Sequence, residues 1–339
     1  MKLPTTVDSI LIRCPNWIGD AVMSSFFFSD VKRIFPNAMV TALAHDPIAE
    51  LLQDVDGIDR WITFSREKKR RAEEEKRVLS FLKSQRFDLG ILLTHSFSSA
   101  WMFWRANIPW RLGLKAHFRS FLLNIRIAPS HEQHDVLSYQ NLLSPFGVSL
   151  PQPVLQIAVR PEELMAMQQS LQQIGIQQDQ HVVIVNPGAA FGLAKCWPQE
   201  YFQRLCELLQ RNPETVLIGI GDAKGRQTVE TIFQKFPRCH NLAGKTSIRE
   251  LVALISLSDL VISNDSGPMH IAAAVRKPLI ALFGSTNPLR TGPWGQATVI
   301  QKKVPCSPCY LRECPKNFCC MKSITPDEVF MHAQQMLSL

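Results

Sequence analysis

Residues 260–274 read LVISNDSGPMHIAAA, and this stretch decides the fold. Its first part, Leu260–Ser263, is a short apolar run with β-branched residues, which favours a buried strand. A polar turn follows, and Pro268 suits the first turn of the helix expected at Met269–Val275. Strand, turn and apolar helix in direct succession predict one strand–helix unit of a parallel α/β sheet.

The same alternation extends outward from this unit in both directions. The strand candidates of the second half are Val182–Val185, Thr215–Ile220, Leu260–Ser263 and Pro278–Phe283. Those of the first half are Ser9–Arg13, Met39–Ala44, Arg60–Phe64, Asp88–Leu93 and Arg111–Leu114. The central runs are continuously apolar, as expected of strands covered on both faces by helices. Strands that alternate with helices predict parallel sheets with right-handed crossovers.

Chain length and one proline-rich stretch predict two domains. The 339 residues exceed what one hydrophobic core usually supports. Leu150–Pro161 carries three prolines and no helical period, which is typical of a linker. We therefore predict an α/β protein of two Rossmann-like, doubly wound domains facing each other across a cleft, at residues 1–155 and 156–339. Ligands of such sheets bind beyond the carboxyl ends of the strands, so the loops there are the candidate sites.

The charge balance favours an anionic partner. The net charge is +8, which suits nucleic acid, a phosphorylated lipid surface or a polyanionic substrate. No nucleic-acid motif accompanies the charge, so we expect no nucleic-acid partner. Asp8 and Arg13 interrupt the first apolar stretch, and the apolar charge-free runs are too short to span a bilayer. We expect a cytoplasmic protein whose membrane contact is peripheral.

The first strand leads directly into a candidate catalytic turn. Asn16 and Trp17 follow the strand, Gly19 permits a tight turn, and Asp20 lies at or near the start of a helix. Asp20 could cap that helix by accepting a backbone N–H bond. Alternatively, it could act as a general base that takes a proton from an acceptor hydroxyl. Spacing alone favours the cap.

The second domain opens with a loop that suits a phosphate. Residues 186–198, NPGAAFGLAKCWP, follow a buried strand and include Asn186, Gly188 and Lys195. Such loops place backbone amides and a cation where a phosphate binds, although this is not a Walker loop. Lys195 could equally be a solvated loop lysine. Asp222, after another strand, could take ribose hydroxyls or cap the next helix.

The turn after Leu260–Ser263 is a second donor-site candidate. A helix N-terminus at the carboxyl end of a strand is a ready anion site. Its candidate residues are Asp265, Ser266, Gly267, Met269 and His270. The alternative is an ordinary cap with His270 buried against the core. The loop Gly284–Pro288, rich in Gly, Ser and Thr, is expected at the same sheet edge.

A basic stretch in the first domain carries the acceptor-site candidates. Arginine and lysine alternate here with three tryptophans and have few acidic neighbours. This pattern suits a phosphorylated or carboxylated sugar acceptor next to a membrane. The residues concerned are Arg105, Arg111, Lys115 and Arg119.

Clustered cysteines near the C-terminus leave a structural metal site open. Cys306, Cys309, Cys314 and Cys319 are close enough in sequence to hold Zn²⁺ or an iron–sulfur cluster. Their spacing is not that of a zinc ribbon, so reduced thiols or a local disulfide are the alternatives.

Together these segments resemble the glycosyltransferase family 9 heptosyltransferases. The matching motifs are IRCPNWIGDAVMS at 12–24, NPGAAFGLAKCWP at 186–198, NDSGPMHIAAA at 264–274 and FGSTNP at 283–288, followed by the cysteine-rich tail. They occur in the family's order and span almost the whole chain. Each motif alone is unspecific, whereas the set is highly specific.

The resemblance implies a GT-B fold and an inverting transfer without a cofactor. The donor would be ADP-heptose, and L-glycero-D-manno-heptose would pass to the lipopolysaccharide inner core on lipid A–Kdo, as its second heptose. The enzyme would work at the cytoplasmic face of the inner membrane. By the same resemblance Asp20 is the base, Lys195 contacts the diphosphate and Asp265–Gly267 grips the donor. Cys196 stands where the family commonly has arginine.

Two other classes of function stay open at this point. One is a different enzyme on the same scaffold, either another family 9 sugar transferase or a nucleotide-sugar epimerase. The other is a nucleotide-sugar or nucleic-acid binding module without catalysis, whose function would survive Asp20→Asn.

Overall fold

The computed structural model describes residues 4, 6–65, 67, 71–130 and 132–337. The chain divides into two compact units, Met1–Ile157 and Ala158–Leu339. The division falls inside the proline-containing stretch 150–161. None of the described helices is both long and apolar enough to cross a bilayer.

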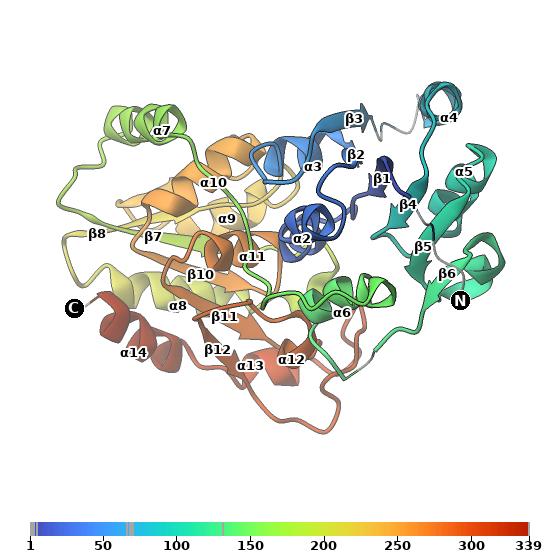
Figure 1. Ribbon diagram of the computed structural model, residues 1–339. Coiled ribbons are helices and arrows are strands. Elements are labelled where there is room, and N and C mark those ends of the chain that lie inside the picture. The colour runs from blue at the N-terminus through green and yellow to red at the C-terminus, as the bar shows by residue number, and fades with distance from the viewer. Residues whose placement is uncertain (1–3, 5, 66, 68–70, 131, 338–339) are drawn as a thin grey trace. The chain divides into compact units, whose positions relative to one another are not determined.

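The first unit is built on a six-stranded parallel sheet with the order β3-β2-β1-β4-β5-β6 (Figure 1). Its strands are β1 Ser9–Arg13, β2 Met39–His45, β3 Arg60–Phe64, β4 Leu89–Leu92, β5 Trp110–Leu114 and β6 Ile125–Ile127. Its helices are α1 Ile18–Met23, α2 Phe27–Ile34, α3 Asp46–Leu51, α4 Arg71–Ser84, α5 Phe97–Arg105 and α6 Asp135–Asn141, with short 3₁₀ turns η1 His117–Leu122 and η2 Ser144–Phe146. Helix α4 packs on α5, whereas α1 packs on α3 and α2 on α6. The strand order reverses between β1 and β4, which is where doubly wound sheets bind ligands.

The second unit has the same architecture, with the order β12-β11-β10-β7-β8-β9 and every strand pair parallel (Figure 1). Its strands are β7 His181–Asn186, β8 Thr215–Gly219, β9 Cys239–Asn241, β10 Leu260–Asn264, β11 Leu279–Phe283 and β12 Thr298–Gln301. Its helices are α7 Pro161–Gln173, α8 Gln199–Leu209, α9 Arg226–Phe233, α10 Ile248–Leu257, α11 Gly267–Ala274, α12 Pro288–Thr291, α13 Cys319–Lys322 and α14 Pro326–Leu337, with the 3₁₀ turn η3 Leu193–Lys195. Here the order reverses between β7 and β10.

Burial explains why the central strands form. Strands β8, β10 and β11 are buried at every residue, because helices cover both faces of the sheet. Helix α8 packs against α9 and α14, and α10 packs against α7 and α11. The two sheets confirm the predicted α/β class with two doubly wound domains.

Trp197 fixes the start of α8 in the second core. Its ring is almost fully buried and packs edge-on against Phe202, with ring centroids 4.9 Å apart. Its indole N–H donates to the carbonyl of Ile324, at 2.9 Å, so the polar end of the ring is satisfied. The loop that carries Lys195 is thereby anchored at its C-terminal end.

Candidate active site

Lys195, Asp265 and Thr286 meet at the carboxyl edge of the second sheet. The Lys195 ammonium lies 2.5 Å from Asp265 Oδ2, and the Thr286 hydroxyl donates to the same oxygen at 2.5 Å. The three residues come from the loops after β7, β10 and β11. The Lys195 side chain is 13% exposed and that of Asp265 only 4%, so the pair is shielded from water. Lys195 is therefore a partly buried, paired lysine and not a solvated loop residue.

Two asparagines hold the turn after β10 against the loop after β7. The Asn186 amide nitrogen donates to Ser263 Oγ at 2.8 Å and to Ser266 Oγ at 2.6 Å. Asn264 accepts a bond from the Trp197 backbone N–H at 3.1 Å and donates to the carbonyl of Pro187 at 2.7 Å. The amide N–H groups of Asn186 are engaged inside the protein, which favours a positioning role for this predicted donor residue.

Helix α11 starts at this turn and presents its N-terminus at the same sheet edge. Ser266 is the N-cap in an extended conformation, and Gly267 begins the helix. The positive end of a helix dipole at this edge favours an anion. Met269 and His270 are buried, so their side chains belong to the packing below the turn. Their assignment to the donor site stays a prediction.

Asp222 and Gly188 differ in what they can offer a ligand. The Asp222 carboxylate accepts the backbone N–H of Gly225 at 2.8 Å, so it holds the turn that precedes α9. Gly188 is half-buried, and a Cβ added to it would meet no atom within 4 Å. Space for a ligand beside the backbone at Gly188 fits the predicted phosphate loop.

The cysteine-rich segment supports the donor-site loops. The Ala194 N–H donates to the Arg312 carbonyl at 3.0 Å, next to Lys195. The Cys309 and Tyr310 N–H groups donate to the Ser285 carbonyl at 3.1 and 2.8 Å. The tail therefore holds two of the three loops that form the Lys195 group. No sequence pattern indicated this role.

The cysteines themselves are all free thiols. Cys306 Sγ and Cys319 Sγ lie 3.7 Å apart, whereas Cys314 Sγ accepts bonds from the Lys316 and Phe318 backbone N–H groups. Within the described part of the chain, no three His, Cys, Asp or Glu side chains form a group that could hold a metal ion. A structural metal at Cys306, Cys309, Cys314 and Cys319 therefore stays a prediction, beside the alternative of reduced thiols.

Gly192→Ala is expected to destabilise the second unit by about 1–3 kcal/mol. A Cβ at Gly192 would collide with the Arg312 backbone, including its carbonyl oxygen, which already accepts the Ala194 bond. Urea unfolding measures the loss. Gly188→Ala is the matched control for stability because nothing lies near its added methyl group. Equal unfolding midpoints for the two variants would contradict the supporting role of the tail.

In the first unit, Asp20 is held by a buried tyrosine. Asp20 lies in the first turn of α1, whose N-cap is Trp17 and not Asp20. The Tyr139 hydroxyl, from α6, donates a hydrogen bond to the Asp20 carboxylate. Burial raises the pKa of Tyr139 well above its ordinary value, and the nearby Asp20 and Asp135 carboxylates add to this effect. The hydroxyl therefore stays protonated and can orient the carboxylate. Tyr139 was not predicted, because it is remote from Asp20 in the sequence.

Tyr139→Phe is expected to lower kcat by about tenfold and to move the acid limb of the pH–rate profile to higher pH. A carboxylate that loses a hydrogen-bond donor takes up a proton more readily, so the proton-accepting role predicted for Asp20 should be lost at a higher pH. The kcat profile measured from acid to neutral pH tests this. Tyr201→Phe, in the second unit, is the control and should keep the original profile. A tenfold loss with no movement of the limb would mean that Tyr139 acts only through packing.

Asn16 and Trp17 lie beside Asp20 but differ in availability. Arg13 Nη2 donates to Asn16 Oδ1 at 2.6 Å, and the His45 ring contacts the Asn16 carbonyl at 2.9 Å. These contacts fix the β1–α1 loop. Trp17 is exposed and remains a candidate for acceptor contact.

Two of the four predicted acceptor arginines and lysines serve the fold. Arg119 is fully buried and donates to the carbonyls of Thr94 and Leu114, at 2.6 and 2.9 Å. Burial lowers the pKa of Arg119 to about 10, which still leaves it charged at neutral pH. Arg111 donates to the carbonyls of Leu122, Ile108 and Pro109, and burial lowers its pKa as well. These contacts favour structural roles for both arginines.

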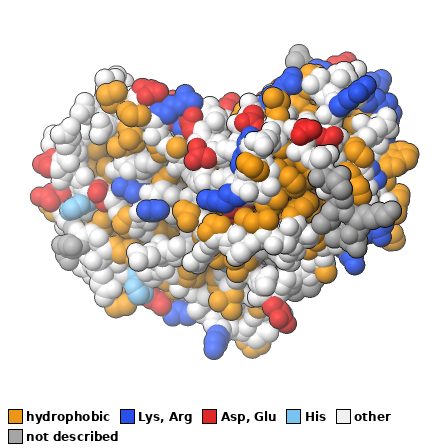
Figure 2. Space-filling view, in the orientation of Figure 1, with side chains coloured by type: hydrophobic (Ala, Val, Ile, Leu, Met, Phe, Trp, Pro, Cys, Tyr) orange, Lys and Arg blue, Asp and Glu red, His pale blue; other side chains and the backbone are white. Residues whose placement is uncertain are grey.

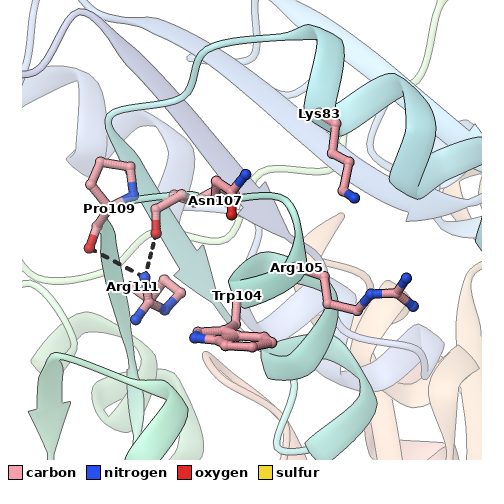
Figure 3. A pocket seen from close by; sticks show the side chains of 7 residues that line it. Lys83, Trp104, Arg105, Asn107, Pro109 and Arg111 are labelled. Carbon is pink, nitrogen blue, oxygen red and sulfur yellow. Dashed lines mark hydrogen bonds between the residues drawn. The ribbon is translucent and has the colours of Figure 1, made fainter.

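The exposed Arg105 lies away from Asp20. Together with Lys83 and Trp104 it lines a cavity of about 470 Å³ at the end of α5 and the start of β5 (Figure 3). That end of β5 is the amino edge of the sheet, whereas Asp20 follows the carboxyl end of β1. Arg105 and Asp20 are therefore not brought together. Lys115 follows β5 at the carboxyl edge and is exposed.

Comparison with known proteins identifies the family. The model of "Glycosyltransferase family 9 (heptosyltransferase)" matches residues 76–319. Lipooligosaccharide heptosyltransferase 2 of Haemophilus influenzae is 31% identical over 86% of this chain and 88% of its own length. The solved ADP-heptose lipopolysaccharide heptosyltransferase II of Escherichia coli is 27% identical, with a TM-score of 0.82 over 97% of this chain and 98% of that chain.

A further solved structure shares the fold at lower identity. The E. coli heptosyltransferase WaaC with ADP-2-deoxy-2-fluoro heptose is 19% identical, with a TM-score of 0.71 over 96% of this chain and 99% of that chain. These likenesses confirm the GT-B class of fold and the predicted resemblance. The chain therefore belongs to glycosyltransferase family 9, the heptosyltransferases.

Proposed function

We propose that this glycosyltransferase transfers L-glycero-D-manno-heptose from ADP-heptose to the inner core of lipopolysaccharide, as its second heptose. The Lys195–Asp265–Thr286 group carries the proposal, because it places a shielded ammonium at the point where a doubly wound sheet binds its ligand. The relative from H. influenzae and the solved E. coli enzyme, both named as heptosyltransferases of this type, support the sugar and the acceptor. The WaaC complex with an ADP-heptose analogue supports the donor. Family membership does not favour an epimerase or a non-catalytic module.

Transfer with inversion needs a base on the acceptor and positive charge on the leaving group. Asp20 takes the proton from the acceptor hydroxyl while the oxygen of that hydroxyl bonds to the anomeric carbon of the donor sugar. The bond from that carbon to the diphosphate breaks, and its electron pair leaves with ADP. Lys195 and the backbone amides at the start of α11 stabilise the negative charge that develops there. Asp265 and Thr286 hold the ammonium in place.

Transfer is expected to proceed equally with and without EDTA. The lysine and the helix N-terminus provide the positive charge in this mechanism, so no cofactor takes part. The experiment supplies ADP-heptose to heptose-deficient lipopolysaccharide cores and measures ADP release and acceptor glycosylation together. Matched release and glycosylation support the proposal. Saturable ADP binding without transfer would overturn the assigned sugar and acceptor while keeping the donor nucleotide.

The acceptor also sets where the enzyme works. Lipid A–Kdo with its core is anchored in a bilayer, so we propose that the enzyme contacts the cytoplasmic face of the inner membrane peripherally. A net charge of +8 suits that anionic surface.

A further inference from the structure

An array of exposed aromatic side chains covers one surface of the first unit. Helix α5 contributes Phe97, Trp101 and Trp104, and the neighbouring turn η1 contributes Phe118 and Phe121. Their side chains are between 39% and 91% exposed. We call these five residues the aromatic surface.

Four of these rings are in contact with one another and are not isolated side chains. Trp101 stacks on Phe97 on one side and on Trp104 on the other, with centroids 6.0 and 4.8 Å apart. The ring of Phe121 lies 6.3 Å from Phe97. Single exposed apolar residues are ordinary, but a contiguous exposed apolar patch marks a contact surface. Tryptophan in particular prefers the headgroup level of a bilayer, where the apolar ring and the indole N–H are both accommodated.

The segment that carries the aromatic surface has charges of one sign only. Residues 89–131 contain five Lys or Arg and no Asp or Glu. Arg111 and Arg119 are engaged with backbone carbonyls. Arg105, Lys115 and Arg126 are exposed, and Arg126 Nε also donates to the Leu123 carbonyl at 2.8 Å. Figure 2 shows hydrophobic and basic side chains together at the surface in the region where Figure 1 labels α4 and α5. This charge is complementary to anionic headgroups.

A basic cavity adjoins the aromatic surface through Trp104. Lys83 reaches it from α4 and Arg105 from the end of α5, while Arg111 turns back onto the carbonyls of Ile108 and Pro109 (Figure 3). Two exposed cations are therefore available to an anionic group in this cavity. A bilayer presents phosphates and apolar chains together, which matches the pairing of this cavity with the rings.

We propose that the aromatic surface, with Lys83, Arg105, Lys115 and Arg126, docks the enzyme on an anionic phospholipid bilayer. The rings insert at the headgroup level and the cations contact lipid phosphates. The proposal rests on the proposed function only for its purpose, which is to bring the enzyme to a membrane-anchored acceptor. It assigns the membrane contact to α5, η1 and the neighbouring basic residues.

The first test removes the two most exposed rings. Phe118 and Phe121 are 91% and 66% exposed, so Phe118→Ser/Phe121→Ser removes little internal packing. Binding to phosphatidylethanolamine–phosphatidylglycerol vesicles, followed by flotation, is expected to weaken by about tenfold or more. The matched control is Leu289→Ser/Met331→Ser, which removes two exposed apolar side chains from the second unit and should bind as the parent does.

The second test reverses charge at the same surface. Lys83→Glu/Arg126→Glu is expected to weaken binding to these vesicles by about tenfold or more at low salt, with less effect at high salt. The control is Arg211→Glu/Lys235→Glu, an equal change of charge at exposed positions in the second unit. Pure phosphatidylcholine vesicles should bind the parent weakly. Circular dichroism checks that each variant is folded.

Three results would overturn the proposal. The ring variant could bind anionic vesicles as tightly as the parent does. Both charge-reversal variants could lose binding equally, which would mean that only the net charge matters. The parent could instead self-associate through these rings, as seen by sedimentation of parent and ring variant, which would make the surface an interface between copies.

Transfer assays separate this proposal from the proposed function. The ring variant should transfer heptose normally to a delipidated, water-soluble core acceptor and poorly to the same acceptor embedded in vesicles. If the parent transfers to neither acceptor while the ring variant still loses vesicle binding, the proposed function fails and the docking surface stands. If the ring variant instead binds vesicles and transfers to the embedded acceptor as the parent does, the docking surface fails and the proposed function stands.

Discussion

Asp20→Asn is expected to lower kcat for heptose transfer by about 10²–10⁴-fold and to leave the Kd for ADP unchanged. The amide keeps the shape of the carboxylate and its contact with Tyr139, but it cannot take the proton from the acceptor hydroxyl. The proposed donor site lies in the second unit, so calorimetric titration with ADP should match the parent. Steady-state kinetics with ADP-heptose and a soluble core acceptor measure the loss.

Asp46→Asn is the matched control for this variant. Asp46 also follows a strand of the first sheet and lies in the first turn of a short helix, α3. Its replacement should cost little activity. Turnover of Asp20→Asn close to that of the parent would assign the proton transfer to another group and leave Asp20 a structural role in α1.

Lys195→Met is expected to lower kcat/KM for ADP-heptose by about 10²–10³-fold, as the loss of one charged group at a developing negative charge does. It should also destabilise the second unit by about 3 kcal/mol, because the buried Asp265 carboxylate loses its cation. Kinetics and urea unfolding are both needed, since the two effects have different causes. Lys224→Met, in the exposed loop after β8, is the control for removing a lysine at this sheet edge.

A double variant separates the two effects. Lys195→Met/Asp265→Asn removes the charge on both partners. The amide oxygen of the new asparagine can still accept the hydrogen bond from the Thr286 hydroxyl, so stability should largely return. Activity should stay low, because the diphosphate still lacks its ammonium. Recovery of turnover in the double variant would show that Lys195 serves Asp265 and not the donor.

The central strands were predictable because burial on both faces leaves a continuous apolar run. The predicted strand Leu260–Ser263 differs from β10 by one residue at its end. The edge strands β6, β9 and β12 were missed, since three or four half-exposed residues carry no such pattern. The stretch Ala21–Phe35 has a helical pattern but is divided into α1 and α2, and no proline or glycine in it marks the division.

Loop chemistry at the sheet edges was predictable for the same topological reason. Parallel strands bring their following loops to one edge, so Lys195 and Asp265 could be expected to lie close together. Sequence could not separate Arg119 from Arg126, because both are arginines in one basic stretch and only burial distinguishes them. Tyr139 was invisible for another reason: its contact with Asp20 depends on how α6 packs.

The hydrogen bonds from the cysteine-rich tail to the donor loops couple the stability of the tail to binding of the donor. A bound nucleotide that stabilises the loops at Ala194 and Ser285 also stabilises the segment Cys309–Arg312. The reason is that the Ala194–Arg312 and Ser285–Tyr310 hydrogen bonds join this segment to the two loops. This linkage is reciprocal, so a change that destabilises the tail lowers the affinity for the nucleotide by the same factor. The amide of Tyr310, which donates to the Ser285 carbonyl, thus becomes a hydrogen-exchange reporter of nucleotide occupancy, although the tail itself lies outside the sheet.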